Sequence, residues 1–161
     1  MSENPANNFA NDIKANKILV AALICGVLIF SIIVAILNWM NGPALAGEEA
    51  KYNNIFIYAV IAVGIICIAI STYTYNKEMS SLKGGSLSLI EKFSKYRTIL
   101  IKHMAVCEFG AIFSVIIIFL TGELKLFAIT TLILATMMSK MPTKKRIVDE
   151  LELNWNEQQE L

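Results

Sequence analysis

The sequence has little charge and few of the residues that build catalytic or metal sites. Charged residues fill 17% of its 161 positions and hydrophobic residues 56%, whereas soluble globular domains have about 25% and roughly 45–50%. It contains one histidine and three cysteines, and an odd cysteine count argues against a disulfide framework. It has no Walker loop, GxSxG, CxxC pair, HExxH or dinucleotide fingerprint. We therefore predict no enzymatic activity, no cofactor and no metal site.

Strand-length alternation of apolar and polar residues is also absent, which argues against a membrane β-barrel. The sequence instead has four apolar stretches, at about 18–38, 54–74, 98–121 and 124–141. The first includes twenty uncharged residues, Ile18 to Leu37, enough for a helix to cross the hydrocarbon core. The fourth has only fourteen, between Lys125 and Lys140. Backbone amides in hydrocarbon must be paired within their own segment. We predict an all-α membrane protein with four transmembrane helices in an up-down bundle over 18–141.

The basic residues lie in alternate connections between these stretches. Eleven lysines and arginines fall in the leader 1–17, the loop 75–97 and the segment 140–146, whereas the other two connections hold only Lys51 and Lys125. Cytoplasmic loops of membrane proteins carry the excess of such residues. This predicts a multi-pass protein of the inner membrane with both termini in the cytoplasm.

The leader 1–17 is polar and asparagine-rich, and we predict that it is disordered. The motif PALAG at 43–47 resembles a signal-peptidase site. The apolar run before it is too long for a typical signal peptide, and the leader is not a compact basic region. We therefore expect the first stretch to be retained as a transmembrane helix.

Two other soluble segments carry helix signals. Ser88 and Glu91 have the spacing of a capping box, which predicts an amphipathic helix on the membrane surface before the third span. Pro142 is expected to end the fourth span. Thr143 can then cap a short amphipathic helix in the tail 142–161, with Ile147 and Leu151 on one side.

Glu108 is a carboxylate near the midpoint of the third span. A charge at the bilayer centre costs at least about 2.5–3.5 kcal/mol on insertion scales, so the group should face the bundle interior and find a partner or hold its proton. Two interpretations stay open: an acid that titrates in function, and a structural hydrogen bond worth about 1 kcal/mol. The expected partners are Thr130, Thr131 and Tyr58.

His103 lies upstream of Glu108 but on a different helix face, about 140° away at 100° per residue. It aligns instead with Cys107, Gly110 and Ser114, at spacings of four, three and four. Small and polar residues in such a stripe mark close packing between membrane helices. We predict that these four residues pack against a neighbouring helix.

The segments CEFGAIFSVIIIFLTG and MPTKKRIVDELEL resemble a family of small, uncharacterised four-helix membrane proteins of Bacteroidota. The shared pattern is an intramembrane glutamate, a small residue, an aromatic, Leu-Thr-Gly and a Pro-Thr-Lys tail. It falls here on Glu108, Gly110, Phe113, Leu120, Thr121, Gly122, Pro142, Thr143 and Lys144. The resemblance implies a bacterial inner membrane and supplies no activity.

The second and third spans are also faintly similar to the ring-forming proteolipid subunit of rotary ATP synthases, in which Glu108 would match the ion-carrying acid. Those subunits pack their first helix through a glycine-rich repeat, whereas the second span here has one glycine, Gly64, among isoleucines.

These observations favour an accessory or assembly subunit that acts through helix packing. The alternative is a proton- or ion-coupled element that uses the Glu108 carboxyl. The expected partners are the lipid bilayer and either a second copy of the chain or a larger membrane complex, with no nucleic acid.

Overall fold

The computed structural model describes residues 5–45, 53–83 and 87–159, and within these ranges the regular elements are all helices. The predicted all-α fold is confirmed. The elements, in chain order, are α1 (Pro5–Asn41), α2 (Asn53–Ser80), α3 (Leu89–Thr121), the 3₁₀ turn η2 (Leu124–Leu126), α4 (Phe127–Ser139), α5 (Lys144–Leu151) and α6 (Trp155–Gln159).

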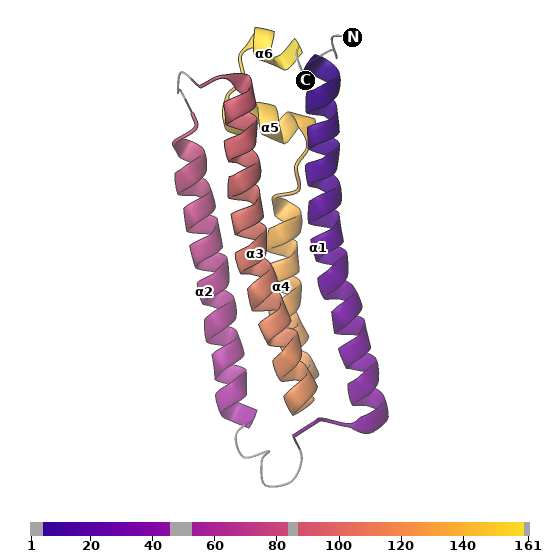
Figure 1. Ribbon diagram of the computed structural model, residues 1–161. Helices are drawn as coiled ribbons and strands as arrows, with labels where there is room; N and C mark the ends of the chain where they lie inside the picture. The colour runs from indigo at the N-terminus through magenta and orange to yellow at the C-terminus, as the bar shows by residue number, and fades with distance from the viewer. Residues whose placement is uncertain (1–4, 46–52, 84–86, 160–161) are drawn as a thin grey trace.

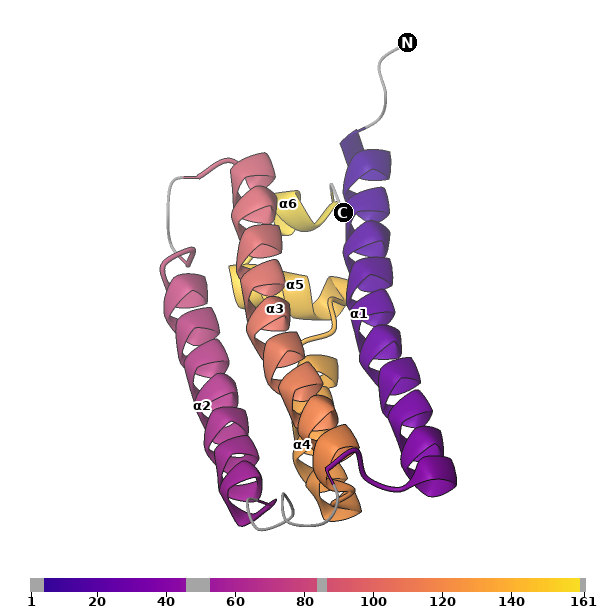
Figure 2. The same ribbon diagram turned by 60° about the horizontal axis from the view of Figure 1, so that its bottom comes forward.

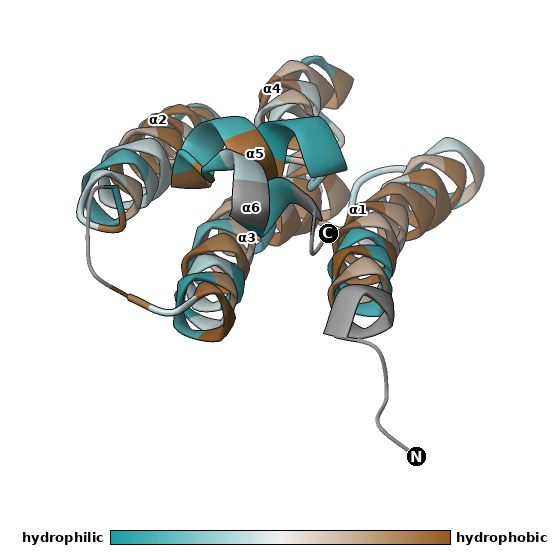
Figure 3. Cartoon of the chain, turned by 90° about the horizontal axis from the view of Figure 1, so that it is seen from above, coloured by the Kyte–Doolittle hydropathy of each residue, from teal (hydrophilic) through white to brown (hydrophobic). Residues whose placement is uncertain are grey.

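The helices α1 to α4 run side by side, and α3 packs against α2, α4 and α1 (Figure 1). α1 and α3 point the same way, and α5 and α6 lie at the end where α1 begins (Figures 1 and 2). We call this the α5 end. Figure 3 looks down on it and shows α5 lying across the bundle between α2 and α1.

Three helices are long and apolar enough to cross a membrane: Phe9–Asn41, Asn53–Ser80 and Leu89–Thr121. The segment Leu124–Ser139 meets Lys144–Leu151 at a bend of 77° and adds a fourth crossing if this pair is counted as one span. The described residues are therefore compatible with a multi-pass membrane protein of three or four spans.

Two predictions about the soluble segments are wrong. The leader was expected to be disordered, but its residues from Pro5 onward form the first turns of α1. The segment after Ser88 was expected to lie along the membrane surface, but it is the coaxial start of α3. Helix propagates through both segments because each is joined to a long apolar helix without a breaker, and extension adds one hydrogen bond per residue.

The predicted caps are present. The Ser88 and Glu91 side chains form a reciprocal capping box at the start of α3, and the Thr143 hydroxyl accepts a hydrogen bond from the Arg146 amide at the start of α5. α4 ends at Ser139, before Pro142. Lys51 and part of PALAG fall outside the described residues.

The far end of the bundle ties α1 to the carboxyl terminus of α3. The Asn38 amide donates to the Ile118 carbonyl at 2.7 Å, and the amides of Ala44 and Leu45 donate to the carbonyls of Phe119 and Leu120. The carbonyls of Phe119 and Leu120 belong to the last turn of α3, where helix carbonyls lack a partner in their own helix, and the Ile118 carbonyl also accepts from the Gly122 amide. α3 then stops at Gly122, whose φ of 70° is accessible to glycine at little cost.

Candidate functional site

The stripe of His103, Cys107, Gly110 and Ser114 is fully buried along α3. His103 is 1% exposed, and Cys107 and Ser114 are 0% exposed. All four residues face the α2 and α4 side of the helix, because their contacts are with those two elements. The role of the stripe follows from these contacts.

The first part of the stripe meets α2. The Cys107 thiol donates a hydrogen bond to the Ser71 hydroxyl at 3.3 Å, and the His103 ring lies edge-on to Tyr75 with centroids 5.2 Å apart. A Cβ atom at Gly110 would lie 3.0 Å from Cys67 Cβ and 3.2 Å from its sulfur. Glycine therefore allows α2 and α3 to approach more closely than any other residue would.

The last residue of the stripe meets α4 instead. The Thr130 hydroxyl donates to the Ser114 hydroxyl at 3.0 Å, and Thr130 is 2% exposed. This buried pair joins the carboxyl-terminal part of α3 to the first turn of α4. Thr130 was expected at Glu108, and the structure places it in this bond.

Glu108 lies on another face of α3. It shares that face with Arg97 and Phe119, each eleven residues away, because eleven residues make three turns to within about 20°. Both residues line hollows between α1 and α3. Glu108 therefore lies on the α1 side of α3, where it is half-buried.

The expected partners of Glu108 are elsewhere. Tyr58 is 72% exposed on α2, and Thr131 is exposed on α4. Among the residues that the structure describes, none makes a hydrogen bond or ion pair with the Glu108 carboxyl. Glu108 therefore lies at the edge of the packed face of α3, beside the fully buried Met104 and Ala111, and the expected bonds to Thr130, Thr131 and Tyr58 are not formed among the described residues.

The neighbouring helices fix the depth of Glu108. Phe9 packs on Phe93 with centroids 5.0 Å apart, and Asn38 bonds to Ile118, so Glu108 is level with the middle of the apolar stretch of α1. On α2, the Cys107–Ser71 bond places Glu108 level with residues on the α5 side of the middle of the apolar stretch. The α1 register places Glu108 within about one turn, roughly 5 Å, of the midpoint of the apolar layer, and the α2 register places it about 9 Å from that midpoint.

An apolar groove follows Glu108 along the same flank. Its volume is about 220 Å³, and it opens between the last turns of α1 and α3. The lining residues are Phe30, Ile33, Val34, Leu37, Ile116 and Phe119. The flank thus combines one mid-depth carboxyl with a hollow that apolar side chains can fill.

A second polar group lies at the α5 end. The hydroxyl of Tyr75, which is 2% exposed, donates to Glu150 at 2.6 Å, and Arg146 Nε lies 3.6 Å from the same carboxylate. The Lys140 ammonium sits 4.2 Å from the Tyr75 ring centroid, within the range of a cation–π interaction. This tyrosine–glutamate cluster (Tyr75, Lys140, Arg146 and Glu150) holds α5 against α2 and α4.

The sequence did not predict the tyrosine–glutamate cluster. No contact was predicted for Tyr75, and Glu150 was expected only as part of the amphipathic tail 142–161. The available signal was the apolar stripe of α5, since Ile147 and Leu151 are 0% and 1% exposed and flank Glu150. A helix that buries such a stripe against the bundle brings its neighbouring carboxylate with it.

The end of the tail is also tied to α3. Lys92 donates to Glu157 at 2.8 Å, and their side chains are only 10% and 19% exposed. The Lys92 hydrogen bond lowers the pKa of the Glu157 carboxyl. Likewise, hydrogen bonds from the Ser88 amide and hydroxyl lower the pKa of Glu91 at the start of α3.

Lys102 in the third apolar stretch extends toward the α5 end. Its ammonium lies 3.0 Å and 3.1 Å from the two carboxylate oxygens of Glu78 on α2. The long side chain therefore carries its charge away from the apolar layer.

Comparison with protein-family models, curated proteins and solved structures found no match. Both family resemblances stay predictions.

Proposed function

We propose that the chain is a four-span protein of a bacterial inner membrane with both termini in the cytoplasm. The fourth span is Leu124–Ser139, which is short and is flanked by Lys125 and Lys140. In support, α1 begins and the tail packs at the same end of the bundle (Figure 1). The basic residues are concentrated in the connections at that end, as expected for a cytoplasmic face.

We further propose that the protein is an accessory or assembly subunit, and that Glu108 contacts a transmembrane helix of another membrane protein. The observation that carries this proposal is the placement of Glu108. Its carboxyl is half-buried near mid-depth, and no described residue of its own chain bonds to it. Leaving a carboxyl there without a partner costs a few kcal/mol, and a hydrogen-bond donor from another helix lowers that cost.

The partner helix should carry a hydrogen-bond donor at mid-depth. It should carry apolar side chains in the half of the membrane that lies away from the α5 end. The donor, from a serine, threonine, asparagine or basic residue, complements the carboxyl. The apolar side chains fit the groove that includes Phe30, Ile116 and Phe119. A second copy of this chain is the less favoured partner, because it would bring a second Glu108 to the contact and require one carboxyl to keep its proton.

Site-specific photocrosslinking in intact membranes tests this proposal. A photoreactive residue replaces Phe119, which is 37% exposed in the groove, or Ile70, which is 50% exposed on α2 and serves as the control. We expect one adduct of defined mass from position 119 and none from position 70. Glu108→Leu should reduce the adduct about three- to fivefold, which corresponds to loss of one interhelical hydrogen bond.

Two outcomes would refute the proposal. An adduct that contains two differently tagged copies of this chain would show a homo-oligomer instead of a partner subunit. Equal adduct yields from wild type and Glu108→Leu would show that the carboxyl does not take part in the contact.

The second candidate function is proton or ion coupling through Glu108. It is favoured by one observation, the partial exposure of a titratable group near mid-depth. Glu108→Gln separates the two functions, because an amide keeps the hydrogen bond but cannot carry a proton.

A further inference from the structure

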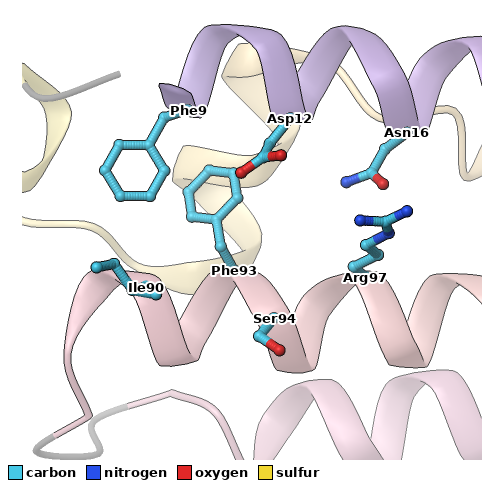
Figure 4. Close-up of a pocket in the computed structure, with 7 residues that line it drawn as sticks. All are labelled: Phe9, Asp12, Asn16, Ile90, Phe93, Ser94 and Arg97. Atoms are coloured by element: carbon cyan, nitrogen blue, oxygen red, sulfur yellow. The ribbon is translucent and has the colours of Figure 1, made fainter. Parts of the chain in front are cut away.

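A cavity opens between α1 and α3 at the α5 end (Figure 4). Its volume is about 180 Å³, equal to about six water molecules at liquid density. The residues that line it are Phe9, Asp12, Asn16, Ile90, Phe93, Ser94 and Arg97. The space is larger than a single ion needs and suits a small polar organic group.

The walls of the cavity carry opposite charges that are held apart. Figure 4 shows the guanidinium of Arg97 facing the amide of Asn16 across the gap between the helices. The carboxylate of Asp12 lies further toward the α5 end, beside the Phe93 ring. Neither charge forms an ion pair with a residue that the structure describes. A ligand with both a negative and a positive group would meet a complementary partner at each position.

The cavity also has a defined position relative to the apolar layer. Asn16 lies two residues before the apolar stretch of α1, which begins at Ile18, and Arg97 directly precedes the apolar stretch of α3, which begins at Thr98. The headgroup layer of a bilayer starts at this level and is about 5–8 Å thick on each side. Asp12, one turn above Asn16, therefore lies at the outer part of that layer.

We propose that this cavity binds the headgroup of a zwitterionic aminophospholipid. The phosphate, next to the acyl chains, lies against Arg97 and Asn16, and the primary ammonium lies further out against Asp12. A guanidinium fork matches phosphate geometry, and the rings of Phe9 and Phe93 add an aromatic wall that favours a cation. The proposal rests on α1 and α3 crossing the membrane and is independent of the contact proposed for Glu108.

The charges distinguish among common headgroups. Phosphatidylglycerol has no cation for Asp12 and would place a neutral glycerol beside its carboxylate. Phosphatidylcholine has a cation but no N–H group to donate to that carboxylate. Phosphatidylethanolamine satisfies both positions and should be preferred.

Binding of short-chain lipids to the purified full chain, measured by native mass spectrometry and calorimetry, tests the proposal. We expect dihexanoyl phosphatidylethanolamine to bind about tenfold or more tightly than the matching glycerol lipid, as loss of one charge-assisted bond predicts. Arg97→Gln should weaken its binding by a similar factor. Asp12→Asn should remove the preference over the choline lipid. The matched controls Lys95→Gln and Asp149→Asn, at exposed sites outside the cavity, should bind like wild type.

Free phosphoethanolamine distinguishes a lipid from a soluble zwitterion. The proposal expects it to bind much more weakly than the short-chain lipid, and equal affinity would overturn the lipid assignment. Equal binding of the three lipids by wild type would overturn the proposal. This comparison needs no variant, so the test still holds if a variant fails to fold. Arg97→Lys, which keeps the cation, should retain part of the affinity lost in Arg97→Gln, and no difference between them would also count against it.

Discussion

Replacing Gly110 by alanine tests the close contact between α2 and α3. The added Cβ would lie 3.0 Å from Cys67 Cβ, 3.2 Å from its sulfur and 3.4 Å from Ile133 Cδ1. Overpacking of this kind costs about 1–3 kcal/mol, whereas alanine gains about 0.8–1 kcal/mol over glycine inside a helix. The Cys67 Cβ is fixed to the α2 backbone, so the clash cannot be relieved by a side-chain rotation.

Gly26→Ala is the matched control, because a Cβ at Gly26 meets nothing within 4 Å. It should be stabilising through helix propensity alone. We therefore expect Gly110→Ala to be less stable than Gly26→Ala by about 1–3 kcal/mol, measured by reversible SDS unfolding in mild detergent with circular dichroism.

A double-mutant cycle with Cys67→Gly isolates the contact. Removing the Cys67 side chain should make the Gly110→Ala substitution less costly than it is in the wild-type background. The packing argument would be refuted if Gly110→Ala were as stable as Gly26→Ala, or if its cost were unchanged in the Cys67→Gly background.

Three further predictions concern the α5 end. Tyr75→Phe removes the hydrogen bond to the Glu150 carboxylate and should destabilise the docking of α5 by about 1.5–3 kcal/mol, seen as faster hydrogen exchange of the α5 amides. The control Tyr73→Phe, at a 65% exposed site, should have no effect. Equal exchange in the two variants would contradict the role of the bond. Because the Lys92 hydrogen bond lowers the pKa of Glu157 in the folded state, its stabilisation is complete above the usual carboxyl pKa and is lost as pH falls through the lowered one. Exchange of α6 should therefore quicken below about pH 4 in wild type, whereas a Lys92→Met variant should show fast exchange already at neutral pH; a pH-independent wild type would argue against the ion pair. A phosphatase fused to the C-terminus should be inactive and a fluorescent protein fused there should fluoresce, and an active phosphatase would refute the cytoplasmic tail.

Helix content and the three long apolar helices could be predicted from the sequence, because lipid leaves the backbone few other solutions. The stripe could also be assigned to one face of α3, because helical spacing alone relates His103 to Ser114. The caps at Ser88 and Thr143 were also predictable, because a cap depends on residues three positions apart.

The sequence could not predict how the helices are placed around α3. Glu108 was expected to bond to Thr130, yet Thr130 bonds to Ser114 and Glu108 lies half-buried on the α1 side of α3. The tyrosine–glutamate cluster joins Tyr75 to Glu150, residues 75 positions apart. Such pairs depend on the 77° bend before α5, and no local pattern encodes that angle.

The most direct test of whether Glu108 holds a contact or carries a proton is proton flux into liposomes that contain either wild type or Glu108→Gln. A hydrogen-bonded contact predicts equal flux from the two proteins, because the amide retains the bond and no proton passes through this position. A flux that is present in wild type and lost in Glu108→Gln would contradict the account and establish the carboxyl as a proton carrier.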